Sequence, residues 1–256
     1  MALATEQRTV ALMYHAVGVT SGAGVDPHYA VGTATFERQM QICLAQGGGV
    51  LSALQWLRGE RGIIVTFDDG HVTNYLHAFP ALKSLGGSAD FFVNPAQVGT
   101  EGFATWAELR EMSDGGMSIQ SHGLDHRHYL TELSPADLRD ELRRARLEIE
   151  EHMGKPVTLL APPGGRMPPR LEDVALEVGY THVLTSKPGT VRRGTRMMCR
   201  LAVTRTLEEK TLDSWLRGGI ELRRTQLRQA GLDAAKRLLG DRRYEAVRNS
   251  LLRARG

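Results

Sequence analysis

Short apolar runs rich in β-branched residues recur along the first two hundred residues of the chain, and most of them are bounded by a turn signal. Runs of this kind predict buried strands. We expect strands over residues 10–15, 63–67, 89–93, 117–120, 157–160, 180–184 and 201–203.

The segments between these runs repeat their apolar residues at helical spacing. Ser134 and Pro135 combine a capping side chain with a proline at the first helical position. We expect helices over residues 35–45 (capped by Thr35), 74–85, 134–153 and 170–178, and a short helix from residue 105. Strands that alternate with helices favour an α/β fold with a parallel sheet, and six or seven such units can close into a barrel.

The run over residues 63–67 ends in two adjacent acids and a glycine, Asp68, Asp69 and Gly70. Two carboxylates at the end of a buried strand are costly, because burial and like charge both oppose ionisation, and a bound cation would remove that cost. His122 and His126 follow another strand-like run. Asp-Asp-Gly alone is typical of a turn, and two histidines at this spacing alone are typical of a surface pair. Together they indicate a site for zinc or a similar divalent ion.

These residues resemble two motifs of the polysaccharide deacetylases, carbohydrate esterase family four. The first motif is Thr-Phe-Asp-Asp-Gly, here residues 66–70, and the second is His-x-x-x-His, here His122 and His126. The resemblance covers about residues 8–205. It implies an irregular (β/α) barrel of about seven parallel strands and the metal-dependent removal of an N-acetyl group from a carbohydrate.

The resemblance also assigns roles within the site. Asp69, His122 and His126 would bind the divalent ion, most suitably Zn²⁺, with Co²⁺, Mn²⁺ and Ni²⁺ as alternatives. Asp68 would be the general base that accepts a proton from the attacking water.

A substrate-binding loop is expected at Pro163, Gly164, Gly165 and Arg166. The backbone N–H of Gly164 would stabilise the oxyanion, since glycine lets the backbone approach a ligand closely. Trp106 is either a core aromatic residue or a groove wall whose flat ring stacks on a sugar.

The chain departs from the family pattern in two places. The third motif usually opens with an arginine that holds the catalytic aspartate, and Ala161 occupies that position; Arg166 is one residue that could reach back. The family also supplies a late histidine as general acid, whereas no histidine follows His182. His15 is the first expected substitute, and His182 is the second. The alternative interpretation of His15 is a hydrogen-bonded histidine at a strand end, although deacetylases that act on β-1,6-linked glucosamine polymers open with a similar Tyr-His.

The basic charge of the chain is concentrated at its end. Residues 1–210 hold 21 Lys and Arg against 24 Asp and Glu, whereas residues 211–256 hold 11 against 5. We expect a catalytic domain over 1–210 and a basic amphipathic helical extension over 211–256. The extension would either pack on the barrel with a basic outer face or contact anionic lipid. Nucleic acid is not an expected partner, because few aromatic residues accompany the arginines.

The sequence favours a cytoplasmic location. If the basic extension contacts lipid, the protein would lie at the inner face of the membrane. Two cysteines give no disulfide framework, and no apolar stretch resembles a signal peptide or a transmembrane helix. The function expected is hydrolysis of an amide in an N-acetylhexosamine-containing oligosaccharide, polysaccharide such as an exopolysaccharide, or lipid-linked precursor. The alternatives are a deformylase or amidase on another small substrate, and a catalytically weakened carbohydrate-binding protein.

Overall fold

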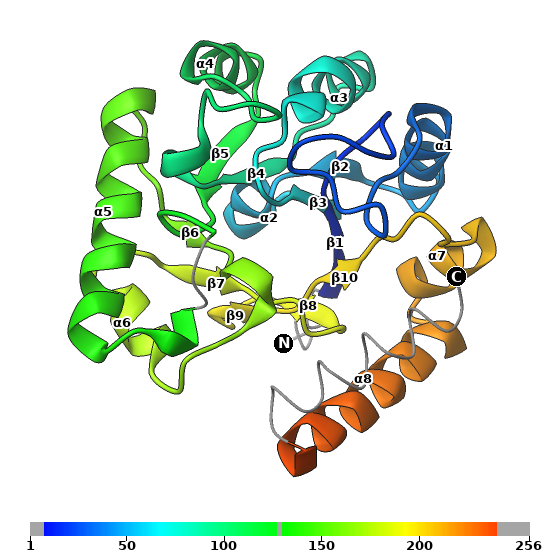
Figure 1. Ribbon diagram of the computed structural model, residues 1–256. Helices are drawn as coiled ribbons and strands as arrows, with labels where there is room; N and C mark the ends of the chain where they lie inside the picture. Colours follow the sequence, from blue (N-terminus) through cyan, green and yellow to red (C-terminus); the bar gives the residue numbers. More distant parts are fainter. Residues whose placement is uncertain (1–7, 127–129, 240–256) are drawn as a thin grey trace, which may run out of the picture.

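The protein is built around one ten-stranded sheet, seen in a computed structural model that describes residues 8–126 and 130–239. The strands lie in the centre of Figure 1. Their bounds are β1 (Arg8–Tyr14), β2 (Gly49–Leu51), β3 (Gly62–Phe67), β4 (Asp90–Val93), β5 (Ser118–Ser121), β6 (Leu159–Leu160), β7 (His182–Leu184), β8 (Thr190–Arg192), β9 (Met197–Met198) and β10 (Leu201–Ala202).

Helices cover the outside of this sheet, as Figure 1 shows for α1, α3, α4, α5 and α6. The helices are α1 (Thr33–Leu44), α2 (Ala53–Arg58), α3 (Phe79–Ser84), α4 (Trp106–Asp114), α5 (Pro135–Met153), α6 (Leu171–Glu177), α7 (Glu209–Leu216) and α8 (Ile220–Leu239). Four short turns of other helix types complete the list: η1 (Asn74–Ala78), η2 (Pro95–Gln97), η3 (Leu130–Glu132) and η4 (Pro163–Gly165).

The sheet forms a nearly closed, irregular barrel, which confirms the expected fold class. Parallel pairing runs in the order β10-β1-β3-β4-β5-β6-β7-β9, while β2 pairs with the start of β3 and β8 pairs antiparallel with β1. The late strand β10 therefore lies beside the first strand, with Leu12 opposite Leu201. Because these strands are parallel, their carboxyl ends meet at one mouth of the barrel.

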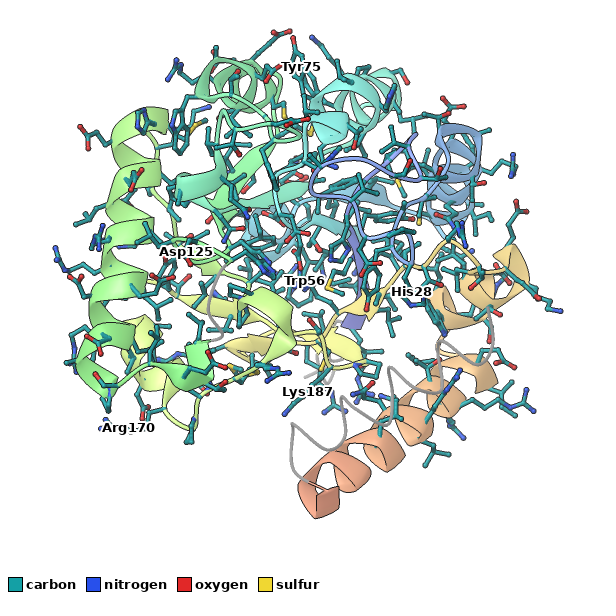
Figure 2. The ribbon with its side chains drawn as sticks, in the orientation of Figure 1. His28, Trp56, Tyr75, Asp125, Arg170 and Lys187 are labelled. Atoms are coloured by element: carbon teal, nitrogen blue, oxygen red, sulfur yellow. The ribbon has the colours of Figure 1, made fainter. Side chains whose placement is uncertain are left out.

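Alternation along the strands separates the barrel interior from the helix-facing core. Phe67 and Phe91 face outward and stack with ring centroids 4.6 Å apart, within the large cluster that packs against the helices. Ala11, Ile64 and Phe92 belong to a second, smaller cluster on the other face of the strands. Figure 2 shows side chains filling the centre of the barrel. Since side chains alternate with period two, Asp68 lies on the same inner face as Ile64.

Two parts of the element prediction were wrong or incomplete. The first helix begins at Thr33 with Gly32 as its N-cap, so Thr35 lies inside the helix and does not cap it. The helix expected over 74–85 is divided into the π-helical η1 and the α-helical α3. The sequence analysis also missed β2, α2, β8 and β9, which have between two and six residues each. Segments this short carry no periodicity that a sequence pattern can register.

The described part of the C-terminal segment is helical and begins by packing on the barrel. Leu212 and Trp215 of α7 and Leu222 of α8 are buried and join the large hydrophobic cluster. None of the helices in the described ranges combines the length and apolar character that crossing a bilayer requires. The expectation for residues 240–256 lies outside the described residues, and the division at residue 210 stays a prediction.

Asp90 is an acidic residue buried at the amino end of β4. The backbone N–H of Ala53, at the start of α2, donates a hydrogen bond to one of its carboxylate oxygens at 2.5 Å. Burial raises the pKa of Asp90 to about 7, outweighing that hydrogen bond. The folded chain therefore keeps a proton that the unfolded chain releases near pH 4.

This proton predicts a pH-dependent stability. The contribution of Asp90 is present at low pH and is lost as pH rises from about 4 to about 7. An Asp90→Asn variant, which cannot ionise, should lose this dependence. Urea unfolding measures this at pH 5 and pH 8. From the lower to the higher pH, the free energy of unfolding of Asp90→Asn should rise relative to that of the natural protein by roughly a few kcal/mol, at about 1.4 kcal/mol per pKa unit. The exposed Asp114→Asn serves as the control, and equal pH responses of all three proteins would contradict the prediction.

Candidate metal and catalytic site

The candidate site lies at the carboxyl ends of β1, β3 and β5, where strand alternation directs Asp68, His15 and His122 into the barrel mouth. Asp69 is the second residue after the end of β3 and adopts a left-handed backbone with φ 71°. Aspartate tolerates this conformation better than most residues. Gly70 has φ 71° as well, and a Cβ there would lie 2.9 Å from Val93. The turn over Asp68, Asp69 and Gly70 thus points the carboxylates of Asp68 and Asp69 in different directions.

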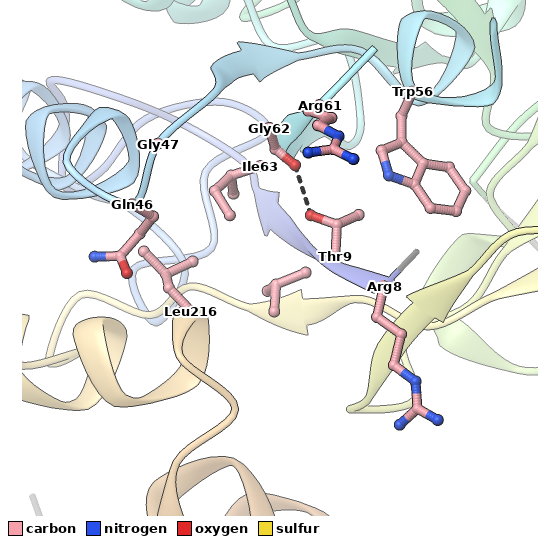
Figure 3. A pocket seen from close by; sticks show the side chains of 10 residues that line it. Arg8, Thr9, Gln46, Gly47, Trp56, Arg61, Gly62, Ile63 and Leu216 are labelled. Carbon is pink, nitrogen blue, oxygen red and sulfur yellow. Dashed lines mark hydrogen bonds between the residues drawn. The ribbon is translucent and has the colours of Figure 1, made fainter. Parts of the chain in front are cut away.

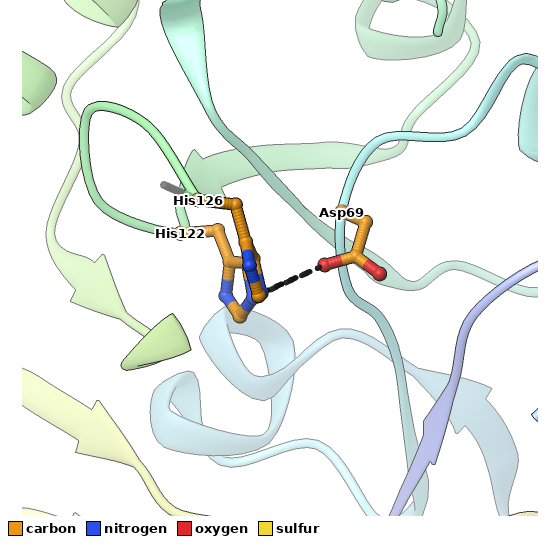
Figure 4. Close-up of side chains that lie close together, drawn as sticks. All are labelled: Asp69, His122 and His126. Carbon is orange, nitrogen blue, oxygen red and sulfur yellow. Dashed lines mark ion pairs between the residues drawn. The ribbon is translucent and has the colours of Figure 1, made fainter. Parts of the chain in front are cut away.

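Asp69, His122 and His126 converge on one point (Figure 4). His122 Nε2 lies 3.3 Å and His126 Nε2 lies 3.7 Å from the same oxygen, Asp69 Oδ1. The three potential ligand atoms all lie within 4.8 Å of one another. Asp69 Oδ1 is buried and accepts no well-formed hydrogen bond from the described residues. A buried, unsatisfied carboxylate oxygen facing two imidazoles fits a divalent cation, and this donor set suits zinc.

The loop that carries the histidines is held from three sides. Asn94, at the end of β4, donates a hydrogen bond from Nδ2 to the carbonyl of His122 at 2.6 Å. Glu141 of α5 accepts the N–H of Leu124 at 2.8 Å. Ser121 Oγ accepts the N–H of Gly123 at 3.2 Å and also the buried hydroxyl of Tyr180 at 2.8 Å. These contacts hold the backbone of residues 121–124, which carries His122.

Asp68 forms a buried, two-pronged ion pair with Arg200. Arg200 Nη1 lies 2.6 Å from Oδ1 and Nη2 lies 2.8 Å from Oδ2, and Arg200 is fully buried. The guanidinium also donates to Thr66 Oγ1 and lies over the ring of Phe92. Ala161 occupies the position of the family's arginine, and Arg166 was the residue suggested to reach Asp68 in its place. Arg200 makes that contact instead. Arg166 lies half-buried just after η4.

Charges in the site set the protonation of its members. Burial acts to raise the pKa of Asp68, but Arg200 outweighs it and lowers that pKa. Burial acts on the pKa of Asp69 in the same way, and the neighbouring His122 lowers it below its ordinary value. The two carboxylates raise the pKa of His122 against the effect of burial. Asp68 is thus an ionised carboxylate beside the cation site, fixed in orientation and able to accept a proton.

His15 lies beside the two acids, at the end of β1. Its ring stacks on Tyr29 with centroids 4.6 Å apart, and its carbonyl accepts a hydrogen bond from Asn74. Burial lowers the pKa of His15, while Asp69 and Asp68 act to raise it. His182, by contrast, begins β7 and hence lies at the amino end of the strands, away from the site. His15 therefore lies next to the acids and His182 does not, and the role of His15 as a general acid stays a prediction.

The loop expected to bind substrate borders the histidine loop. Pro163 is buried, and a Cβ on Gly123 would lie 3.2 Å from its ring. Gly164 and Gly165 are exposed and have φ values of 61° and 65°, a conformation that favours glycine. The loop can therefore present backbone N–H groups near the site. That the N–H of Gly164 stabilises the oxyanion stays a prediction.

Trp106 is the first residue of α4, and its half-buried ring stacks on His152 near the end of α5 with centroids 4.1 Å apart. It also packs against the large hydrophobic cluster. This contact agrees with the core-aromatic interpretation, and sugar stacking stays a prediction.

A separate hollow of about 320 Å³ lies at the amino ends of β1 and β3 (Figure 3). Thr9, Trp56 and Ile63 are among its lining residues. It contains none of the predicted site residues, so the site chemistry belongs to the other mouth of the barrel.

Comparison with known proteins supports the family resemblance. The profile described as polysaccharide deacetylase matches residues 58–183, which include both acids and both histidines. The match bears out the resemblance of this chain to the polysaccharide deacetylases. YxkH of Bacillus subtilis, a protein assigned to the polysaccharide deacetylases, is 31% identical over 134 residues. That alignment covers 52% of this chain and 48% of YxkH, so the chain matches about half the length of this relative.

Solved structures of polysaccharide deacetylases share the fold. A polysaccharide deacetylase from Bacillus cereus superposes with a TM-score of 0.73 at 28% identity, covering 82% of this chain and 69% of that one. The deacetylase PplD from Streptococcus pyogenes, solved with acetate, has a TM-score of 0.75 at 23% identity. That comparison covers 83% of this chain and 99% of PplD and shows likeness of fold.

The convergence of three ligands predicts a bound ion. His122→Ala and His126→Ala should each lose zinc that the natural protein retains, because two remaining ligands hold a divalent ion poorly. Metal content after dialysis against buffered zinc, measured by elemental analysis, checks this. His182→Ala, at the opposite mouth, should retain the metal. Unchanged content in both ligand variants would show that the ion, if any, binds elsewhere.

The buried ion pair predicts a large loss of stability when Arg200 is removed. Arg200→Met leaves Asp68 buried without its partner, which should lower the free energy of unfolding by about 3–5 kcal/mol. The control Arg38→Met breaks an exposed pair with Glu209, at 2.8 Å, and should cost about 0–1 kcal/mol. Urea unfolding at pH 7 measures both. Adding Asp68→Asn to Arg200→Met should recover part of the loss; similar small losses in all variants would contradict the assignment.

Proposed function

We propose that the protein is a metal-dependent carbohydrate N-deacetylase, a hydrolase of the amide bond in N-acetylhexosamine units. The observation that carries the proposal is the ionised, buried carboxylate of Asp68, fixed by Arg200 beside the converging Asp69, His122 and His126. A site that only bound sugar would have little need of an ionised base. The match to the polysaccharide deacetylases supports the same reaction class.

The proposed reaction needs a base, an oxyanion donor and an acid from this chain. A divalent ion held by Asp69, His122 and His126 would polarise the amide carbonyl and make a water more acidic. Asp68 accepts a proton from that water as its oxygen bonds to the carbonyl carbon. The N–H of Gly164 stabilises the negative oxygen. His15 donates a proton to the nitrogen as the C–N bond breaks, leaving acetate and a free amine.

The substrate is proposed to be an oligosaccharide or polysaccharide, such as an exopolysaccharide, or a lipid-linked precursor that contains N-acetylhexosamine. A deformylase or amidase would use the same groups on a different acyl substrate. The third possibility, a weakened carbohydrate-binding protein, rested partly on the missing arginine. Arg200 supplies that contact to Asp68 from the residue before β10, which favours an active enzyme.

The proposal places the enzyme in the cytoplasm, in peripheral contact with the inner face of the membrane. The basic excess of residues 211–256 supports contact with anionic lipid. Fractionation of cells that produce the untagged protein tests this location, and recovery outside the cytoplasm would exclude it.

Acetate release tests the proposed reaction. The natural protein should release acetate from chitooligosaccharides or partly acetylated glucosamine polymers, and a chelator should abolish the release. Asp68→Asn should keep its metal and lose at least about a hundredfold in rate, since an amide cannot accept the proton. Natural turnover by Asp68→Asn would remove this residue from the mechanism. Release of formate, or of an amine from another amide, in place of acetate would favour the alternative substrate classes.

The proposed acid predicts a change in the pH dependence. A general acid acts in its protonated form, so activity should fall as pH rises through the pKa of His15, which burial lowers. His15→Ala should lower the rate by ~10²–10⁴-fold and lose this alkaline decline. The pH–rate profile on one substrate measures both effects, with His182→Ala as the control. A profile that His15→Ala leaves unaltered would assign His15 a structural role.

A further inference from the structure

Exposed apolar side chains are concentrated on α8. Among the described residues, five large hydrophobic side chains are exposed, and Ile220, Leu227 and Leu232 on α8 account for three of them. Ile220 and Leu227 are exposed by 62% and 74%, more than any other in that set. Both lie seven positions apart, so they point to the same side of the helix. Burial of this pair against another surface would be favourable.

The opposite side of α8 is the one that meets the protein. Leu222 is buried there, and Thr225 accepts a hydrogen bond from the indole N–H of Trp215 at 3.1 Å. At about 100° per residue, Ile220 and Leu227 lie about 140–160° around the helix from Leu222. The apolar pair therefore faces away from the barrel. Figure 1 shows α8 running past the edge of the barrel rather than between other helices.

Arginines surround this apolar pair. Arg224 lies between Ile220 and Leu227 along the same side, and Arg223 and Arg228 flank it. All three arginines are exposed. Glu221 is the one acid between residues 220 and 232, and it pairs with Arg224 at 2.6 Å. The outer side of α8 thus combines apolar side chains with net positive charge.

We propose that this outer face, defined by Ile220, Arg223, Arg224, Leu227 and Arg228, docks the protein on an anionic lipid bilayer. An amphipathic helix of this kind lies in the plane of the interface, with its aliphatic side chains below the headgroups. Each arginine near an anionic surface strengthens binding by about fivefold at moderate salt. The inference goes beyond the general charge of the C-terminal segment, because it assigns the contact to one face of one helix.

Other occupants fit this face less well. A second copy of the chain, joined through a two-fold axis, would bring the same arginines toward each other, and like charges disfavour that contact. A stable protein partner commonly buries about 800 Å² on each side. Two aliphatic side chains and three arginines provide a smaller and more strongly charged contact, which suits an anionic surface.

Vesicle flotation with the full-length chain tests the docking face. The natural protein should float with phosphatidylcholine vesicles that contain about a third phosphatidylglycerol, and much less with phosphatidylcholine alone. Raising the salt to about 0.5 M should weaken the interaction by screening. Ile220→Ser with Leu227→Ser, and separately Arg223→Gln with Arg224→Gln and Arg228→Gln, should each lower the partition coefficient roughly tenfold or more.

Matched variants elsewhere on the surface control for general changes in hydrophobicity and charge. Leu76→Ser with Leu147→Ser removes two exposed aliphatic side chains, and Arg143→Gln with Arg144→Gln removes two exposed arginines of α5. Both should float like the natural protein. The inference rests on the membrane contact in the proposed function, but acetate release and zinc content should be unchanged in the α8 variants, so its failure is distinguishable from failure of the proposed reaction.

Several outcomes would overturn the proposal. Absence of binding to anionic vesicles at low salt would exclude the lipid surface, and natural binding by both α8 variants would exclude this face of α8. Analytical ultracentrifugation distinguishes the remaining case. A dimer that Leu227→Ser dissociates would show that the face contacts a second copy of the chain.

Discussion

The site depends on the ion pair between Asp68 and Arg200 inside the barrel. A carboxylate in an apolar barrel would ordinarily hold its proton and would then be no base. Arg200 reverses this by offering two parallel N–H donors at 2.6 and 2.8 Å and a charge that cannot be lost. Thr66 and the ring of Phe92 hold the guanidinium in turn. The ionised state of Asp68 is therefore a property of the barrel interior as a whole.

The rest of the mouth of the barrel follows from strand geometry. Period-two alternation directs His15, Asp68 and His122 inward from three different strands, and parallel pairing places their ends at one level. The left-handed turn at Asp69 then adds a fourth group that alternation alone would direct outward. Asn94, Glu141 and Ser121 fix the histidine loop from three separate elements. The backbone of residues 122–124 is consequently held by hydrogen bonds from three elements.

Sequence reasoning found the parts of this arrangement that are encoded locally. The β-branched run before Asp68 and Asp69 predicts both the strand and the position of the acids at its end. The resemblance of the two motifs implies that His122 and His126 bind one ion with Asp69, and the structure brings these three side chains together. Arg200 could not be found in this way, because it lies 132 positions from Asp68 among 32 lysines and arginines. Its selection depends on the pairing of β10 with β1, a long-range contact that no local pattern records.

The pairing of β10 with β1 has a consequence for the order in which the chain supplies the parts of the site. The four residues from Asp68 to His126 that form the base and the ligand set lie within the first half of the chain, whereas the partner of the base arrives with β10. A chain that ends before β10 would contain every ligand residue, yet its Asp68 would lack the counter-charge of Arg200. The ligand residues are thus all encoded before the middle of the chain, whereas the charge state of the base depends on the last strand of the sheet.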